Sequence, residues 1–212
     1  NLCGALEFSE KISKTGTQPI IGTQINLNIS DIIGKVTLYA TSEKGYKNLT
    51  KLSSLSYLKN NKMTLPSCNL KDLSENNEDL ILLTGNFMNF FGKLFSKNKL
   101  KEFEQILDYL KNTFKDRLYL EIQRHNDPQE KNFENYLLNI SKSLQLPLIA
   151  TQEIFYLEQD MHEAHDALIC IGEKNFVDDK NRFRYKNHHY FKPQEEIEKL
   201  YSDIPEALEN NY

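Results

Sequence analysis

The sequence predicts an α/β fold in which a parallel sheet carries helices on its outside. Short apolar runs recur along the chain, amphipathic helix-length segments separate the later ones, and residues 80–85 form a nearly continuous apolar run, as buried parallel strands do. Both a barrel and a doubly wound sheet fit this alternation. Only about five strands are visible, whereas a closed α/β barrel needs about eight, so we expect an incomplete distorted barrel of the (βα)7 type.

The first elements are a helix over residues 5–14 and two strands. The helix is expected to end at Gly16, because glycine tolerates the left-handed backbone that closes a helix. The strands are predicted over 20–27, which opens after a proline, and over 36–40, which alternates apolar and polar residues.

The middle of the chain begins with a helix over 43–58, where apolar residues recur at three-residue steps. Residues 59–79 are polar and rich in asparagine, which predicts a loop with room for a short helix. After the strand over 80–85, helices are predicted over 87–96 and 99–114, where phenylalanines and leucines follow helical spacing and indicate core.

The last part continues the alternation with a strand over 118–123, a helix over 128–144, a strand over 148–151 and a helix over 159–171. Residues 172–192 are irregular, and a short helix follows over 193–200. Asp203 and Glu206 have the spacing of a capping box, so they predict a helix start. This helix stops at the chain end, and we therefore expect the sequence to be a piece of a longer protein.

Composition excludes several classes of protein. The chain has 212 residues, of which 39% are hydrophobic and 26% charged, with a formal net charge of −4. A core of useful size is available, and a negative balance argues against a surface built to bind nucleic acid by charge. No apolar stretch approaches the roughly 18 residues of a membrane span. Cys3, Cys68 and Cys170 lack metal or disulfide spacing, which predicts a reduced, cytoplasmic protein.

Candidate chemistry lies at the carboxyl ends of the predicted strands, since the nucleotide-binding, esterase and zinc-protease motifs are absent. Four polar residues follow strands there: Gln24, Asn86, His125 and Glu153. A carboxylate and an imidazole can bind a divalent metal and generate hydroxide. The alternatives remain a hydrogen-bonded loop histidine for His125 and a structural carboxylate for Glu153.

Other histidines and lysines offer weaker candidates. His162 and His165 lie one helical turn apart and can chelate a metal, but exposed helix histidines are common. His188 and His189 alternate sides of an extended segment, which disfavours a shared metal. A basic stretch fits a solvated surface better than a phosphate contact, and it consists of Lys93, Lys97, Lys99 and Lys101.

Seven segments together carry a family resemblance: Asn1–Phe8, Pro19–Gly22, Gly45–Leu49, Tyr119–His125, Leu146–Thr151, Glu163–Leu168 and Pro205–Asn210. In this combination the chain resembles the polymerase-and-histidinol-phosphatase (PHP) domain of bacterial DNA polymerase III alpha subunits. The resemblance implies a single PHP domain over residues 1–212 that lacks its N-terminal strands, with residues from about 202 beginning the connection to the polymerase palm. It also implies a metal site at the carboxyl ends of the strands in active members.

Compared residue by residue with that family, the site is degraded. Gln24 stands where the family has a glutamate, and Phe155 stands where active members have a histidine. Glu153 replaces an aspartate, and His125 occupies a position where active members also carry histidine. The resemblance therefore implies vestigial metal ligands at His125 and Glu153, no catalytic residue in this chain and no bound cofactor.

The implied function is that of a fragment of the catalytic alpha subunit of a replicative DNA polymerase, a nucleotidyltransferase whose palm uses Mg²⁺. This domain is expected to be an inactive scaffold that supports the polymerase and docks the proofreading exonuclease, with the clamp and DNA bound through the rest of the protein. One alternative is an active metal-dependent phosphoesterase or pyrophosphatase, and another is a binding module unrelated to replication. Missing strands would leave a sheet edge unpaired, so we expect self-association.

Overall fold

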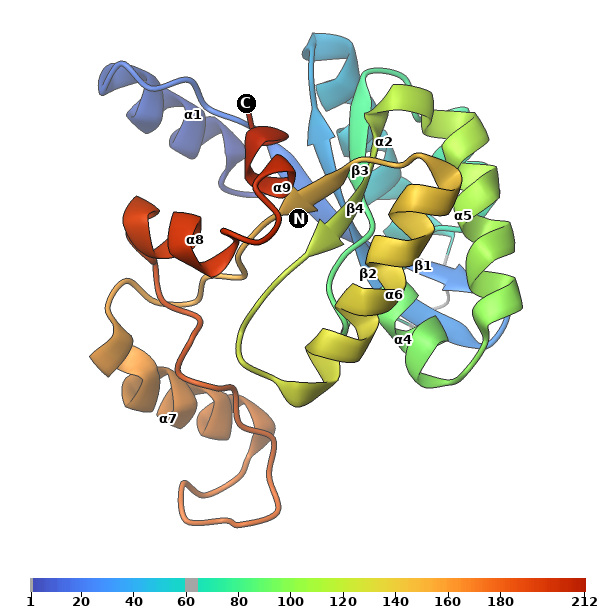
Figure 1. Ribbon diagram of the computed structural model, residues 1–212. Coiled ribbons are helices and arrows are strands. Elements are labelled where there is room, and N and C mark those ends of the chain that lie inside the picture. The colour runs from blue at the N-terminus through green and yellow to red at the C-terminus, as the bar shows by residue number, and fades with distance from the viewer. Residues whose placement is uncertain (1, 60–64) are drawn as a thin grey trace. The chain divides into compact units, whose positions relative to one another are not determined.

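The computed structural model describes residues 2–59 and 65–212 (Figure 1). Five strands form one sheet in the order β1-β2-β3-β4-β5. They are Gly22–Ile29 (β1), Ile32–Ala40 (β2), Leu80–Leu83 (β3), Leu118–Ile122 (β4) and Leu148–Ala150 (β5). The sheet has two ends and does not close within the described ranges. The predicted α/β class with an incomplete barrel sheet is therefore confirmed.

The helices agree with the predicted segments to within a few residues. They are α1 (Ala5–Lys14), α2 (Glu43–Leu58), α3 (Leu70–Glu75), α4 (Phe90–Ser96), α5 (Leu100–Phe114), α6 (Pro128–Leu144), α7 (His162–Glu173), α8 (Gln194–Leu200) and α9 (Glu206–Glu209). Short 3-10 turns cover Lys115–Arg117 (η1) and Gln159–Met161 (η2). Residues 60–64 of the predicted loop lie outside the described residues, and α3 occupies its later part.

The direction of the first strands differs from the predicted parallel sheet. β1 pairs antiparallel with β2, and β2 pairs antiparallel with β3, whereas β3 and β4 run parallel. The cause is a tight hairpin: Ile29 pairs with Ile32, and only Ser30 and Asp31 connect them. Ser30 has a φ of 56°, the positive value that the first central residue of a two-residue hairpin turn requires. Two residues cannot make the long crossover that parallel neighbours need.

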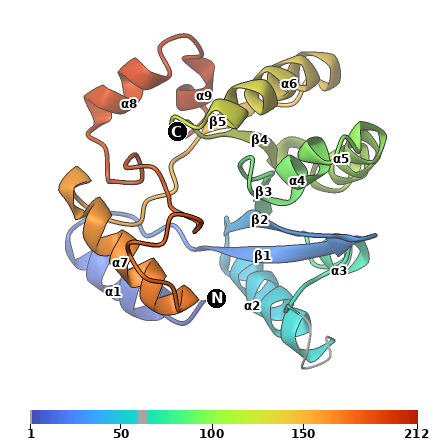
Figure 2. The same cartoon turned by 90° about the horizontal axis from the view of Figure 1, so that it is seen from below.

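The chain divides into two compact units. The first contains the residues up to Glu121 together with Leu144–Pro147. Its core forms where helices pack on the β1–β2 ribbon, along which α2 lies (Figure 2). Alternate residues of both strands are buried, among them Leu27, Val36 and Leu38, as expected for strands with one apolar face. The helix α4 contributes Phe90, Phe91 and Leu94, all fully buried, which confirms the predicted aromatic core.

Two helical glycines allow a matched test of this packing. A Cβ on Gly92 in α4 would lie 1.9 Å from the carbonyl oxygen of Phe87, whereas a Cβ on Gly172 in α7 would meet nothing within 4 Å. We expect Gly92→Ala to lower the free energy of unfolding by about 2 kcal/mol, because the added methyl group overpacks the site. We expect Gly172→Ala to raise it by about 0.5 kcal/mol through helix propensity. Urea unfolding of both variants measures these shifts, and equal shifts would contradict the packing.

The outer edge of β1 is partly covered. Cys68 binds the backbone of Asn26 and Asn28 there, with N–O distances of 2.8 and 2.9 Å. Gly22 and Gln24 point their backbone groups the same way, and the Gln24 carbonyl accepts the hydroxyl of Thr23 from the same strand, at 3.5 Å. An uncovered strand edge is a template for pairing with another chain.

Self-association through this edge is therefore expected. Replacing Gln24 by proline removes one outward N–H and should shift the 212-residue chain toward monomer in sedimentation velocity. A chain that is monomeric at every concentration before the substitution would contradict the expectation.

The second unit contains Ile122–Ser143 and Leu148–Tyr212. Its last turns correct the predicted capping box. The helix α9 starts after Pro205 without any side-chain cap, and Asp203 instead receives hydrogen bonds of 2.7 and 2.9 Å from Arg124. A two-point bond to a guanidinium is stronger than a bond to a backbone N–H, which explains why the carboxylate turns away from the helix.

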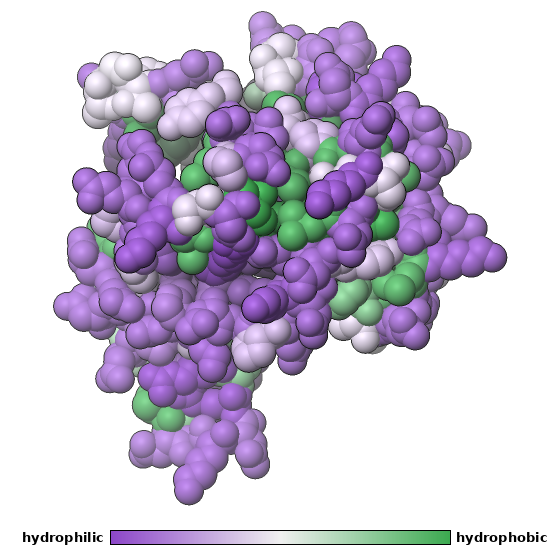
Figure 3. Space-filling model, in the orientation of Figure 1, coloured by the Kyte–Doolittle hydropathy of each residue, from purple (hydrophilic) through white to green (hydrophobic). Residues whose placement is uncertain are grey.

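The surface is mostly polar on the face drawn in Figure 3, where apolar side chains gather only in small patches. None of the helices in the described residues combines the length and the apolar composition that crossing a bilayer demands.

Candidate functional site

His125 lies in the loop after β4 and is buried, with 4% of its surface exposed. Its backbone N–H donates to Glu130 Oε2 at 2.8 Å, and its Nδ1 lies 3.2 Å from Glu130 Oε1. Glu130 is in the first turn of α6, five residues further on, so the helix start brings this carboxylate back to the loop. Burial alone would raise the pKa of Glu130, but its hydrogen bonds to His125 hold the pKa below its usual value.

The other ring nitrogen of His125 faces the backbone that follows β5. The N–H of Glu153 approaches His125 Nε2 at 3.4 Å, so this nitrogen accepts and Nδ1 carries the proton. The carbonyl of Glu153 in turn accepts from His189 Nδ1 at 2.9 Å. The structure thus brings the two predicted ligands, His125 and Glu153, together, but this hydrogen bond between them uses the backbone of Glu153. Both nitrogens of His125 are committed within the protein.

Phe155 belongs to a ring cluster, which we define as His125, Phe155, His165, Tyr185 and His189. The rings of His125 and His189 stack with centroids 4.1 Å apart and an interplanar angle of 7°. Phe155 stacks on His189 at 4.9 Å and on His165 at 5.0 Å, and it meets Tyr185 at 4.7 Å. The phenyl ring therefore fills, with apolar contacts, the position at which the family resemblance implies a metal-binding imidazole.

An ion pair anchors the irregular segment that carries Tyr185 and His189. Arg182 donates to both oxygens of Asp166 on α7, at 2.6 and 2.5 Å, and both side chains are almost fully buried. These bonds hold the pKa of Asp166 below its usual value. The segment is thus fixed to α7 on one side and stacks on the His125 loop on the other.

The remaining predicted strand-end residues, Gln24 and Asn86, lie in the first unit. Gln24 is exposed on β1. Asn86 is buried, and its side-chain oxygen accepts from the N–H of Met88 at 2.9 Å, which makes it a turn residue.

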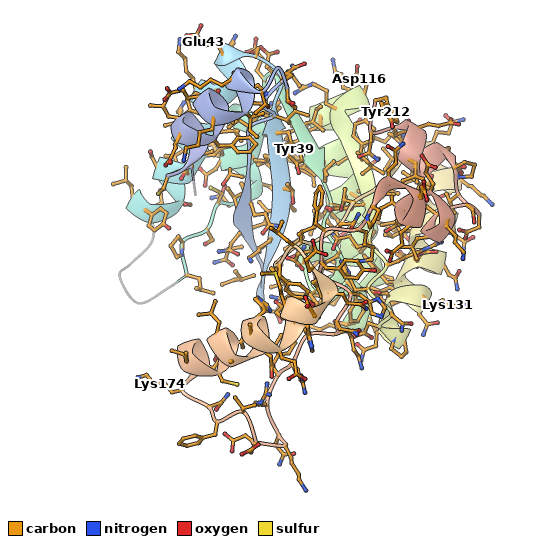
Figure 4. The ribbon with its side chains drawn as sticks, turned by 90° about the vertical axis from the view of Figure 1, so that its left-hand side faces the viewer. Tyr39, Glu43, Asp116, Lys131, Lys174 and Tyr212 are labelled. Atoms are coloured by element: carbon orange, nitrogen blue, oxygen red, sulfur yellow. The ribbon has the colours of Figure 1, made fainter. Side chains whose placement is uncertain are left out.

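Figure 4 shows Tyr39 on β2, whose pKa is raised by burial and by the charge of Glu121 on β4. The buried carboxylate of Glu121 was not predicted from the sequence. A polar residue inside a strand is expected to alternate with apolar residues and to face solvent.

The weaker candidates have other partners. Nε2 of His162 lies 2.9 Å from the carbonyl oxygen of Tyr185, a hydrogen bond within the protein. In the basic stretch, Lys93 donates to the carbonyl of Ile33 at 2.8 Å, and Lys99 binds Asp31 at 2.5 Å. These contacts are structural.

The donor set does not fit a multi-metal centre. Across residues 2–59 and 65–212, no three histidine, cysteine, aspartate or glutamate side chains gather in a way that could hold a metal ion. His125 would have to give up the Glu153 N–H to offer Nε2, and neither an amide at Gln24 nor a phenyl ring at Phe155 supplies a strong ligand.

Glu130 and His189 also shape this site, and only the first of them could have been found in the sequence. Glu130 lies in the first turn of the predicted helix, where a carboxylate can reach back to preceding N–H groups. His189 could not be assigned, because nothing in an irregular segment tells which of two adjacent histidines is buried.

Comparisons with known proteins show which family and which proteins this chain is similar to. The family model of the PHP domain matches residues 1–125. The chain is 37% identical over 220 residues to DNA polymerase III subunit alpha of Caulobacter vibrioides, covering 99% of this chain and 19% of that protein. It is 36% identical to the protein of that name from Rickettsia bellii, covering 99% and 18%, and 31% identical to the one from Vibrio cholerae, covering 100% and 19%. The chain thus spans about a fifth of the length of these relatives.

Proposed function

This chain belongs to the PHP domain family, and we propose that it is the PHP domain of a DNA polymerase III alpha subunit, in which it acts as a scaffold without a competent metal centre. The identity of 31–37% to polymerase alpha subunits along almost all of the chain supports the parent protein. On this proposal the parent is a DNA-directed DNA polymerase whose palm, outside this chain, uses Mg²⁺, and residues 1–212 form one domain.

The observation that carries the scaffold role is the commitment of His125. Glu130 and the Glu153 N–H engage both of its ring nitrogens, and Phe155 completes a stack of rings beside it. A histidine held in this way orders two loops and offers no free lone pair to a metal. Glu153 stays a vestigial ligand in this proposal, and Gln24 and Phe155 stay degraded ligand positions.

Two assays test the proposal. The full-length protein should incorporate deoxynucleotides with Mg²⁺, and the 212-residue chain should incorporate none. Calorimetric titration of the intact PHP domain with Mn²⁺ or Zn²⁺ should show no site tighter than about 100 μM. Hydrolysis of an aryl phosphate that is lost on His125→Ala would overturn the scaffold role and favour the phosphoesterase alternative.

The proposed partners are the proofreading exonuclease, docked on this domain, and the clamp and DNA, bound through the rest of the parent protein in the cytoplasm. Co-purification of the exonuclease with the full-length protein, and its loss when the PHP domain is removed, would support this. Exonuclease binding that persists without the domain would contradict it.

A further inference from the structure

The second unit contains a cavity of about 750 Å³ outside the ring cluster, bordered by the loop after β4, the first turns of α6 and the segment leading into α8. From its lining we propose that this cavity binds a carboxylate group through the ammonium of Lys192. The site is separate from the proposed scaffold role and does not depend on it.

Lys192 is the unusual member of the lining. Only 6% of its surface is exposed, which is rare for a lysine. Its ammonium donates to the carbonyl of His188 and lies 4.3 Å from the centre of the Tyr190 ring. No carboxylate of the described residues forms an ion pair with it. An ammonium has three N–H donors, so a buried lysine with one acceptor keeps two donors for a ligand.

The carboxylates around the cavity are mostly engaged. Glu134 and Asp203 use both oxygens on Arg124, and Glu130 uses both on the His125 loop. Glu196 receives the Tyr190 hydroxyl on one oxygen. Arg124 in turn gives all of its donors to protein acceptors. Asp127, the fifth carboxylate of the lining, accepts the N–H of Gln129 on one oxygen. Spare donors in the lining are those of Lys192, and of Lys131 on α6 (Figure 4).

Charge selects among possible anions. The lining contains three cationic side chains and five carboxylates, so the lining as a whole repels anions, and it repels a dianionic phosphate more strongly than a monoanionic carboxylate. A single carboxylate adds one charge and matches the two spare donors of Lys192 in size. Burial lowers the pKa of Lys192, with Glu196 opposing this, and a bound carboxylate would relieve that cost. The remaining acidic oxygens belong to partly exposed residues, where water and salt screen them.

Nuclear magnetic resonance of the full 212-residue chain tests this site. Acetate should produce saturable shifts of the backbone signals of Asn126, His188 and Lys192, half-complete at a millimolar concentration, and chloride at the same ionic strength should not. Lys192→Met should weaken binding at least about tenfold, and Lys131→Met about twofold. Lys199→Met is the matched control, because Lys199 is exposed on α8 outside the cavity, and it should leave binding unchanged.

A second comparison identifies the source of the carboxylate. An acetylated dipeptide with a free carboxyl end and its amidated form distinguish a peptide end from a small free acid. Tighter binding of the free-acid peptide than of acetate favours a protein segment, and equal binding favours a small molecule. Acetate binding unchanged in both Lys192→Met and Lys131→Met, no saturable acetate effect up to about 100 mM, or saturable binding of ethylammonium in its place would each overturn the proposal.

Discussion

Replacing Arg124 by alanine is expected to lower the free energy of unfolding by about 3 kcal/mol, because it leaves the largely buried Glu134 carboxylate, whose side chain is 15% exposed, without a partner. The guanidinium donates five hydrogen bonds of 2.5–2.9 Å: two to Glu134, two to Asp203 and one to the carbonyl of Leu200. It also lies 4.9 Å from the ring centre of Tyr201, which is almost fully buried. One side chain therefore joins the start of α6 to the segment after α8.

Arg124→Lys is expected to lower the free energy of unfolding by more than half of the amount expected for Arg124→Ala. The reason is that an ammonium has three donors and no planar fork. The matched control is Arg184→Ala. That side chain is 47% exposed and pairs with Glu163 at 3.8 Å and Asp166 at 3.4 Å, so its loss should cost less than about 1 kcal/mol. Urea unfolding measures all three variants. A lysine at position 124 that unfolds at the same urea concentration as arginine would show that the five-bond network contributes little.

Acidification should destabilise the protein between pH 6.5 and about 4. Burial, together with the adjacent His125, lowers the pKa of His189 from 6.5 to about 4. Between these pH values the His189 ring binds a proton in the unfolded chain but not in the folded chain. The contribution of His189 to stability is therefore complete above pH 6.5 and falls as the pH drops toward 4. The slope is at most about 1.4 kcal/mol per pH unit, which gives a loss of about 3 kcal/mol.

The charges facing His189 are those of His125, Lys192 and Glu130. His189→Gln keeps a side-chain N–H for the Glu153 carbonyl but cannot titrate, so its unfolding free energy should depend less on pH in this window. Chemical-shift titration of the His189 ring gives an independent value. A ring that titrates above pH 6 would remove the basis of this prediction.

The sequence was informative wherever a local pattern decides the structure. Three-residue apolar steps placed α2, and Pro128 followed by regular apolar spacing placed α6 with the observed bounds. The antiparallel pairing of the first strands was not predicted, because Ser30-Asp31 lacks the glycine that usually marks a two-residue hairpin. The predicted capping box failed because a distant guanidinium outcompetes a local N–H for Asp203, and no local pattern contains Arg124.

The candidate site was predictable in part for the same reason. His125 and Glu153 both follow predicted strands, which predicted that they lie at the same edge of the sheet. The structure brings them into contact. His125 stacks on His189, which lies 64 positions later in an irregular segment. No local sequence pattern predicts a contact over that separation, so it is seen only in the structure. The buried ammonium of Lys192 likewise follows from how the chain turns before α8, which periodicity does not encode.

The end of the sheet at β5 differs from the end at β1. The outward carbonyls of Leu148 and Ala150 accept the side-chain amides of Asn210 and Asn211, at 2.7 and 3.1 Å. These amides occupy the acceptors that an incoming polypeptide would need to extend the ladder. We therefore expect these two asparagines to disfavour fibril growth from this side, without any additional strand.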